Sequence, residues 1–177
     1  MERLETERLL LRRPRRDDVR PIFERYASDA EVTRYLSWRQ HHSLEDTDVF
    51  LAFSDGEWSR WGCGPYLVFA RDDGTLLGST GLAFESRELA STGYVFARDA
   101  WGQGFATESL RAMIALARAR GLARLYAICH IDHRASSRVM EKAGLLREGV
   151  LPRHTVFPNI SPFACDVLSY GISLRAA

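Results

Sequence analysis

The chain has 177 residues, with 24 Lys and Arg against 23 Asp and Glu and a net charge of +1. This length suits one domain with a substantial core, so we expect a single domain over residues 1–177. The balanced charge provides no global field to attract nucleic acid. The amino terminus lacks a hydrophobic signal core and no apolar run reaches membrane-spanning length, which predicts a cytoplasmic protein without a membrane or nucleic-acid partner. The cysteines lack metal-type spacing, so we predict no metal site and expect them to be small buried side chains: Cys63, Cys129 and Cys165.

The first half of the chain predicts one strand, three helices and a strand meander. Asp17 can cap the first helix, and Asp73-Gly74 favours a hairpin turn. The aromatic segment 58–66 is predicted as a loop, either a lid over a substrate or a hydrophobic plug. In chain order the expected elements are a strand over 8–13, helices over 17–26, 29–36 and 44–53, and strands over 66–70, 76–84 and 90–97.

The second half predicts two helices between strands. A helix over 107–120 has an apolar stripe and ends at Gly121, and a shorter helix over 135–143 ends at Gly144. Strands, then helices, then strands indicate an α+β fold with a mixed sheet. The remaining elements are strands over 124–130, 146–151 and 166–174, with a loop over 152–163.

Between a predicted strand and a predicted helix lies the sequence Trp-Gly-Gln-Gly-Phe-Ala-Thr-Glu, residues 101–108. Free N–H groups of a first helical turn, the helix dipole and nearby glycines together favour a phosphate or pyrophosphate. A P-loop would need a lysine here, but the single lysine is Lys142. A dinucleotide-binding fingerprint would need a small residue at Thr107 and an acid on the next strand.

The segment 101–106 is similar to the acetyl-coenzyme A loop of the Gcn5-related N-acetyltransferase (GNAT) superfamily, Gln/Arg-x-x-Gly-x-Gly/Ala. Gly104 and Ala106 match its last two landmarks, while Trp101 replaces Gln or Arg. With Gly102 and the run Ala-Thr-Glu, this resembles the branch that contains the ribosomal-protein alanine N-acetyltransferases.

Two further segments carry the same resemblance. Residues 133–145 follow the family pattern Asn-x-x-Ser-x-Arg-Val-x-Glu-Lys-x-Gly-Phe, except that His133 replaces Asn and Leu145 replaces Phe. Residues 5–12, Glu-Thr-Glu-Arg-Leu-Leu-Leu-Arg, resemble the first strand of this branch. The resemblance therefore extends over nearly the whole chain.

The resemblance implies a mostly antiparallel central sheet flanked by helices, in which a central strand pair splays to hold acetyl-CoA as co-substrate. The strand before the loop is expected to bulge and free N–H groups over residues 94–97, with Phe96 nearest the acyl group. Ser136 would lie near the sulfur as the catalytic proton donor, or else simply cap its helix. His133 would keep a hydrogen bond to the pantetheine or titrate and make coenzyme affinity pH-dependent. The implied cofactor-binding residues are Phe96, Ala97, Gly102, Gln103, Gly104, Phe105, Ala106, Thr107, His133 and Ser136.

The predicted function is acetyl transfer to a primary amine of a protein N-terminus, an amino acid or another small molecule, by direct attack in a ternary complex. No general base is assigned, since Glu85, Glu88, His154 and Asp166 each have an ordinary surface explanation. Arg138 and Lys142 either reach the coenzyme phosphates or are solvated on their helix. Two alternatives stay open: a non-catalytic acyl-CoA sensor of the same fold, and a nucleotide-binding α/β domain, against which the strand meander speaks. The branch also admits a homodimer, which nothing in the sequence decides.

Overall fold

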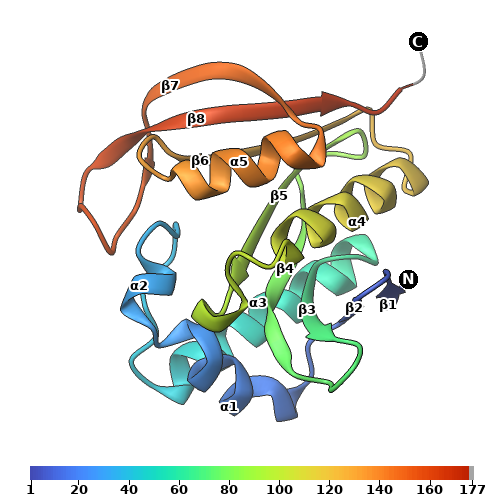
Figure 1. Cartoon of the computed structure of the whole chain (residues 1–177), viewed down its shortest axis with the longest axis vertical. Coiled ribbons are helices and arrows are strands. Elements are labelled where there is room, and N and C mark those ends of the chain that lie inside the picture. The colour runs from blue at the N-terminus through green and yellow to red at the C-terminus, as the bar shows by residue number, and fades with distance from the viewer. Residues whose placement is uncertain (176–177) are drawn as a thin grey trace.

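The computed structural model describes residues 1–175, which form one eight-stranded sheet in the order β1-β2-β3-β4-β5-β6-β8-β7. All neighbouring strands are antiparallel except β5 and β6, which are parallel. The sheet opens into a V between β5 and β6, with α4 crossing in front and α3 passing behind in the view of Figure 1. The predicted α+β fold with a mostly antiparallel sheet is therefore confirmed, and a doubly wound nucleotide-binding domain is excluded.

The first arm of the V holds the amino-terminal strands. The helical segments between β2 and β3 pack on one face of these strands. Within this arm the elements are β1 (Arg3–Glu5), β2 (Leu9–Arg12), η1 (Arg16–Asp18), α1 (Val19–Ile22), η2 (Phe23–Ala27), α2 (Ala30–Thr33), α3 (Leu44–Trp61), β3 (Pro65–Ala70), β4 (Leu76–Phe84) and β5 (Leu89–Phe96).

The second arm is built from the carboxyl-terminal strands with α5 beneath them (Figure 1). Its elements, with the short turn and helix that join the arms, are η3 (Arg98–Ala100), α4 (Phe105–Ala119), β6 (Arg124–His130), α5 (Arg134–Ala143), β7 (Leu146–Val156) and β8 (Ala164–Ser173). No helix in the part of the chain that the structure describes is long and apolar enough to cross a membrane.

Two apolar clusters hold the sheet between its helical layers. The side chains of β3 point alternately into the two clusters. Tyr66 and Val68 pack with Leu110 and Met113 of α4 in the first cluster, whereas Leu67 packs with Ile22 of α1 in the second. All six side chains are at most 1% exposed. The first cluster fixes α4, and hence the loop before it, against the strands.

The helix α3 is eight residues longer than predicted. Gly56 does not end it, because Gly56 lacks the positive φ of a helix C-cap, and the helix continues until Gly62, whose φ of +62° ends it. Trp58 is buried and its Nε1 donates to the Pro65 carbonyl at 3.0 Å. The predicted loop over 58–66 is therefore wrong for its first four residues, which are helical.

Smaller differences have local causes. Asp18, not Asp17, accepts the backbone N–H of Arg15 at 2.7 Å, and the expected first helix is divided into 3-10, α and π turns. The helix predicted over 29–36 ends at Thr33. β7 runs to Val156 rather than 151, with a break in its pairing between Leu151 and Thr155.

Candidate active site

The loop before α4 is shaped by two glycines in the left-handed region. Gly102 has φ +75° and Gly104, the N-cap of α4, has φ +84°. The helix begins at Phe105, two residues before the prediction. Across the described residues, the N–H groups from Gly102 to Thr107 have no hydrogen-bond acceptor, whereas Glu108 N donates to the Gly104 carbonyl. These unpaired donors and the positive end of the α4 dipole form an anion site.

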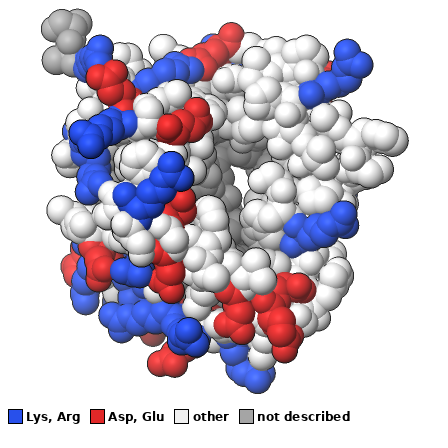
Figure 2. Space-filling model, turned by 180° about the vertical axis from the view of Figure 1, so that it is seen from behind, with Lys and Arg blue, Asp and Glu red and all other residues white. Residues whose placement is uncertain are grey.

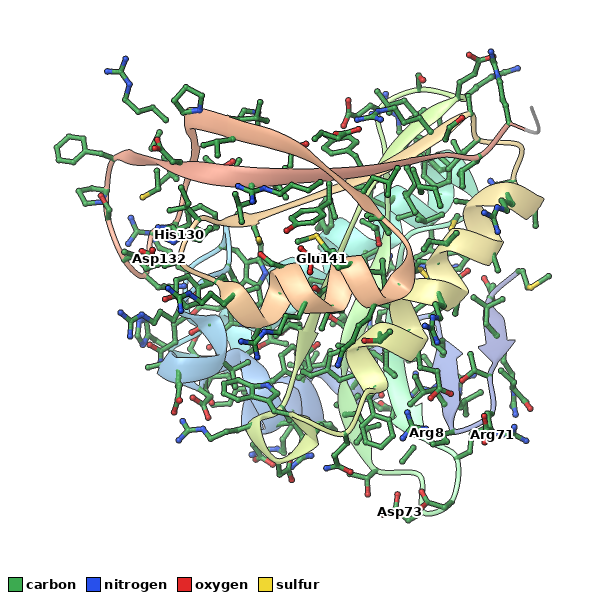
Figure 3. The ribbon with its side chains drawn as sticks, turned by 45° about the horizontal axis from the view of Figure 1, so that its top comes forward. Arg8, Arg71, Asp73, His130, Asp132 and Glu141 are labelled. Atoms are coloured by element: carbon green, nitrogen blue, oxygen red, sulfur yellow. The ribbon has the colours of Figure 1, made fainter. Side chains whose placement is uncertain are left out.

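The amino-terminal strand holds this loop in place. Glu108 accepts hydrogen bonds from Thr6 Oγ1 at 2.6 Å, from Arg8 N at 2.9 Å and from Arg8 Nε at 2.8 Å. Arg8 Nη1 also donates to the Gln103 carbonyl at 3.0 Å, and its guanidinium lies 4.6 Å above the Phe105 ring. Although burial opposes it, bonding from Thr6 and Arg8 keeps the pKa of Glu108 below its usual range. Figure 3 places Arg8 beside the base of α4.

Trp101, the residue that departs from the family pattern, connects the loop to the end of β5. Its Nε1 donates to the Phe96 carbonyl at 2.8 Å. The Gln103 side chain turns back to donate to the Asp99 carbonyl at 2.7 Å. Neither contact uses a backbone N–H group of the loop.

The parallel pairing of β5 with β6 ends early. It covers only Leu89 to Ser91 against Arg124 to Tyr126, and beyond these residues the strands separate. The β4–β5 register is continuous through Phe96, so the expected bulge in β5 is wrong, while the expected splay is confirmed.

The hydrogen-bond pattern between β4 and β5 determines which N–H groups of β5 face the gap. Ala97 N donates to the Leu77 carbonyl at 2.8 Å, continuing the β4 ladder. Because N–H groups alternate along an antiparallel strand, those of Tyr94 and Phe96 point toward the gap. The expected free N–H is therefore present at Phe96, whereas the N–H of Ala97 is already bonded to β4.

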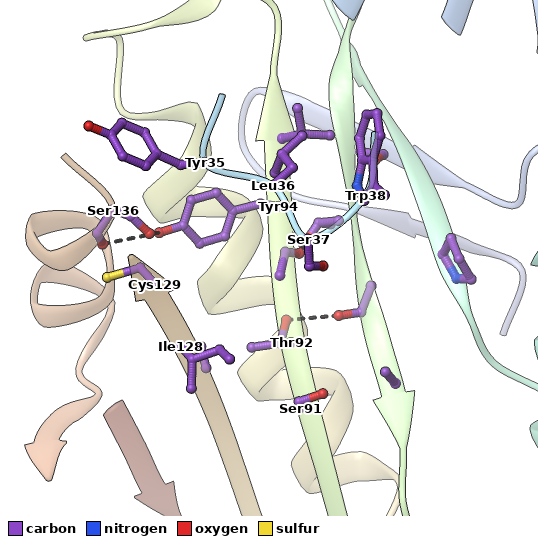
Figure 4. A pocket seen from close by; sticks show the side chains of 18 of the residues that line it. Tyr35, Leu36, Ser37, Trp38, Ser91, Thr92, Tyr94, Ile128, Cys129 and Ser136 are labelled. Atoms are coloured by element: carbon purple, nitrogen blue, oxygen red, sulfur yellow. Dashed lines mark hydrogen bonds between the residues drawn. The ribbon is translucent and has the colours of Figure 1, made fainter. Parts of the chain in front are cut away.

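Ser136 and Tyr94 meet across the gap. The two hydroxyl oxygens lie 2.9 Å apart, and Tyr94 Oη donates to the Ser136 carbonyl at 3.1 Å (Figure 4). Ser136 is 8% exposed and stands in the first turn of α5, whose N-cap is His133. The helix-cap alternative for Ser136 is thus wrong. Burial raises the pKa of the Tyr94 phenol, so it is a protonated donor at neutral pH. No local sequence pattern predicted this hydroxyl pair.

His133 lies at the mouth of the gap, stacked on Tyr35 with ring centroids 4.5 Å apart. Burial, with a smaller contribution from His130, lowers the pKa of His133 to about 4. An imidazole with this pKa is neutral near pH 7, so titration of His133 would not change coenzyme affinity there. Figure 3 shows neighbouring His130 at the start of the loop into α5.

The gap continues into a cavity of about 490 Å³ that passes from Ser136 and Cys129 to the helix α3. On the face opposite Figure 1, the surface is hollowed near its centre and most side chains around the opening are uncharged (Figure 2). Phe50, Phe53 and Glu57 line the cavity from one face of α3.

The four residues considered as bases stand outside the cavity. Glu85 accepts a hydrogen bond from the Tyr126 hydroxyl, and Glu88 pairs with Arg175 at 2.7 Å. Asp166 accepts the N–H of Arg153 at 2.8 Å, and His154 is exposed and lies 2.9 Å from the neighbouring Thr155 hydroxyl.

Glu57 is the acidic residue that sequence reasoning missed. It follows Phe50 and Phe53 by seven and four positions, a helical spacing that would have placed it on the same face had α3 been extended past Gly56. Arg138 and Lys142 are exposed on α5, in agreement with the interpretation that they are solvated on this helix. Within residues 1–175, no group of three or more His, Cys, Asp or Glu is placed to hold a metal ion.

Comparison with known proteins decides the family. Residues 8–146 match the family model described as an acetyltransferase (GNAT) domain. The chain belongs to the GNAT family. It is an N-acetyltransferase by this membership, and it is 34% identical over 174 residues to the uncharacterized N-acetyltransferase YoaA of Bacillus subtilis, covering 94% of each chain.

Solved structures of GNAT members share the fold. A GNAT-family acetyltransferase from Bacillus anthracis has a TM-score of 0.83 and 26% identity, covering 97% of this chain and 98% of its own. The ribosomal L7/L12 alpha-N-protein acetyltransferase RimL, solved with coenzyme A, has a TM-score of 0.84 at 22% identity, covering 97% and 98%.

Proposed function

We propose that this GNAT enzyme transfers the acetyl group of acetyl-CoA to a primary amine by direct attack in a ternary complex. The observation that carries the proposal is the arrangement of three features along β5: the unpaired N–H groups at 102–107, which follow the end of this strand, the gap between β5 and β6, and the cavity that residues of both strands line. We infer that they provide one path from an anion site to a chamber for an acceptor.

The residues of this path fit coenzyme A. The N–H groups of Gly102, Gly104 and the first turn of α4 would bind its pyrophosphate, because charge-assisted bonds to backbone donors are strong. The free N–H groups of Tyr94 and Phe96 would bind the pantetheine and the thioester oxygen. Neutral His133, at the mouth of the gap, would keep one hydrogen bond to the pantetheine. RimL was solved with coenzyme A, which supports this co-substrate for the shared fold.

Acetyl-CoA supplies an activated acyl group as a thioester. The chain must polarise the carbonyl, admit a neutral amine and protonate the departing sulfur. The Tyr94 and Phe96 N–H groups serve the first need, and the Ser136 hydroxyl serves the last. Ser136 Oγ would give its proton to the sulfur, and the proton that the amine nitrogen loses would return to Ser136 through the adjoining Tyr94 hydroxyl, so that both hydroxyls end protonated.

A covalent acetyl-enzyme is disfavoured by the state of the nearest thiol. Cys129 lines the cavity but is 4% exposed, and burial raises the pKa of its thiol. A protonated buried thiol is a weak nucleophile. Direct attack by the amine is therefore the simpler route.

Two measurements test the proposal together. Calorimetry reports binding of acetyl-CoA, and thiol release reports turnover against N-terminal peptides, amino acids, polyamines and aminoglycosides. We expect binding and amine-dependent release with at least one class. Binding with no release for any amine would favour a non-catalytic acyl-CoA sensor, and absence of binding would refute the co-substrate.

A further inference from the structure

The cavity has a single charged side chain in its lining. Among the described residues that surround it, Glu57 alone carries a charge at neutral pH, since His133 is neutral there. Glu57 is half-buried and takes no part in any ion pair or side-chain hydrogen bond within residues 1–175. A carboxylate in an otherwise uncharged chamber, with no partner from the chain, is complementary to a cation.

Glu57 lies well away from the reacting centre. A side chain on Gly64 would come within 3.2 Å of Glu57 Cβ, so Glu57 stands beside the start of β3. There Pro65 pairs with Gly81 of β4, which pairs with Gly93 of β5. Because neighbouring strands are about 4.8 Å apart, β3 and the β5 edge of the gap are separated by roughly 10 Å.

The space between these two points is uncharged, and apolar side chains line it together with the hydroxyls of Thr80 and Thr92. Phe53, Trp38 and Leu36 line it on the helical side. At the gap itself the lining includes Ile128 and Phe157. The cavity therefore has a negative end beside β3 and an uncharged end beside the Ser136–Tyr94 pair.

We propose that Glu57 binds a second positive charge of the acceptor, and that the preferred acceptor is a diamine-like molecule whose two cationic groups are separated by an apolar segment of roughly 10 Å. This inference rests on the proposed function, because it names the acceptor class of the same site. It makes Glu57 a specificity-determining residue and not the general base.

The two ends of the cavity would treat the two nitrogens of such a molecule differently. Apolar surroundings disfavour the charged form of an amine, so the nitrogen at the gap is driven toward the neutral, nucleophilic form. The carboxylate of Glu57 favours the charged form of the distant nitrogen. One chamber thereby selects a dication and still presents a reactive amine to the thioester.

The test compares matched acceptors with and without the second charge. Straight-chain α,ω-diamines of four to ten carbons and the monoamines of the same lengths are assayed for kcat/KM by thiol release. We expect the wild type to prefer the longer diamines over their monoamines by about tenfold or more, as a charge-assisted contact predicts. In Glu57→Gln the diamine advantage disappears and the monoamine rates stay unchanged, which also shows that the variant is folded.

Two further variants sharpen the result. Asp48→Asn removes an equal charge from the exposed, opposite face of α3 and leaves the diamine advantage intact. Glu57→Asp keeps the charge but withdraws it by one methylene, so the preferred diamine becomes longer. Equal kcat/KM values on diamines and monoamines in the wild type, or an equal fall in kcat/KM on both in Glu57→Gln, would overturn the inference about Glu57 and leave the proposed function in place. No acetylation of any amine would overturn the proposed function as well.

Discussion

Replacing Gly104 by valine tests the anion site most sharply. Gly104 has φ +84°, and a Cβ there would lie 3.4 Å from Arg8 Nη2. A non-glycine residue in this conformation costs about 1–3 kcal/mol, which lowers Tm by about 2–12 °C for a chain of this size. The loss of affinity should be larger than this strain suggests. If the altered loop loses two charge-assisted hydrogen bonds, each about 1.5–3 kcal/mol, acetyl-CoA binds about a hundredfold or more weakly.

Gly74→Val is the matched control, because Gly74 has φ +74° with no neighbour within 4 Å and lies in the β3–β4 hairpin. Thermal melting should fall similarly in both variants. Calorimetry should show weakened acetyl-CoA binding only in Gly104→Val. If Gly104→Val binds acetyl-CoA within threefold of the wild type, the loop does not hold the coenzyme.

Ser136→Ala should lower kcat by about 10²-fold or more while acetyl-CoA affinity changes little, since general-acid groups contribute about 10²–10⁴-fold; an unchanged rate removes Ser136 from proton transfer. Tyr94→Phe should lower kcat less, because Ser136 keeps its own proton, and a pH–rate profile that matches the wild type would contradict the relay. The pKa of Glu108 is lowered in the folded state, so the stability that this carboxylate contributes is present above about pH 4.3 and is lost as the pH falls through the folded-state pKa. Glu108→Gln should therefore flatten the acid limb of a curve of unfolding free energy against pH. An unchanged acid limb would show that the contacts of Glu108 with Thr6 and Arg8 do not stabilise the fold. Asn159→Ala removes the hydrogen bonds that the Asn159 side-chain amide donates to the carbonyls of Thr33 and Trp38, at 2.7 and 2.9 Å. Because Trp38 lines the cavity, this variant should raise the KM for the acceptor more than the KM for acetyl-CoA in steady-state assays. Equal changes in the two KM values would argue that these hydrogen bonds play no part in shaping the cavity.

Local sequence signals predicted the parts of the site that lie within one short segment. Glycines at 102 and 104 followed by a helical pattern were enough to predict the loop and the presence of a helix after it, although α4 begins at Phe105 and not at Thr107, because left-handed glycines and free first-turn donors are properties of a few adjacent residues. Ser136 and His133 both line the cavity, whereas the residues of the loop lie outside its lining, and the binding of coenzyme A by all of them stays a prediction.

Contacts between distant segments were not predictable in this way. The Tyr94–Ser136 pair joins residues 42 positions apart, and the Arg8–Glu108 contact joins residues 100 positions apart. Glu57 was hidden by a different error: the helix was predicted to end at residue 53, short of Gly56 and Glu57, although an exposed glycine inside a helix costs only about 1 kcal/mol against alanine. Burial of Trp58 on the same helix outweighs this cost.

The most direct test of acetyl transfer is to follow a labelled acetyl group. Acetyl-CoA carrying a deuterated acetyl group is incubated with the enzyme and the diamine series, and products are measured by mass spectrometry alongside free thiol. Acetyl transfer to an amine in a ternary complex predicts one labelled acetyl group on the amine for each thiol released, with no label on the protein. Thiol release without labelled amine, or release no faster than without enzyme, would contradict it.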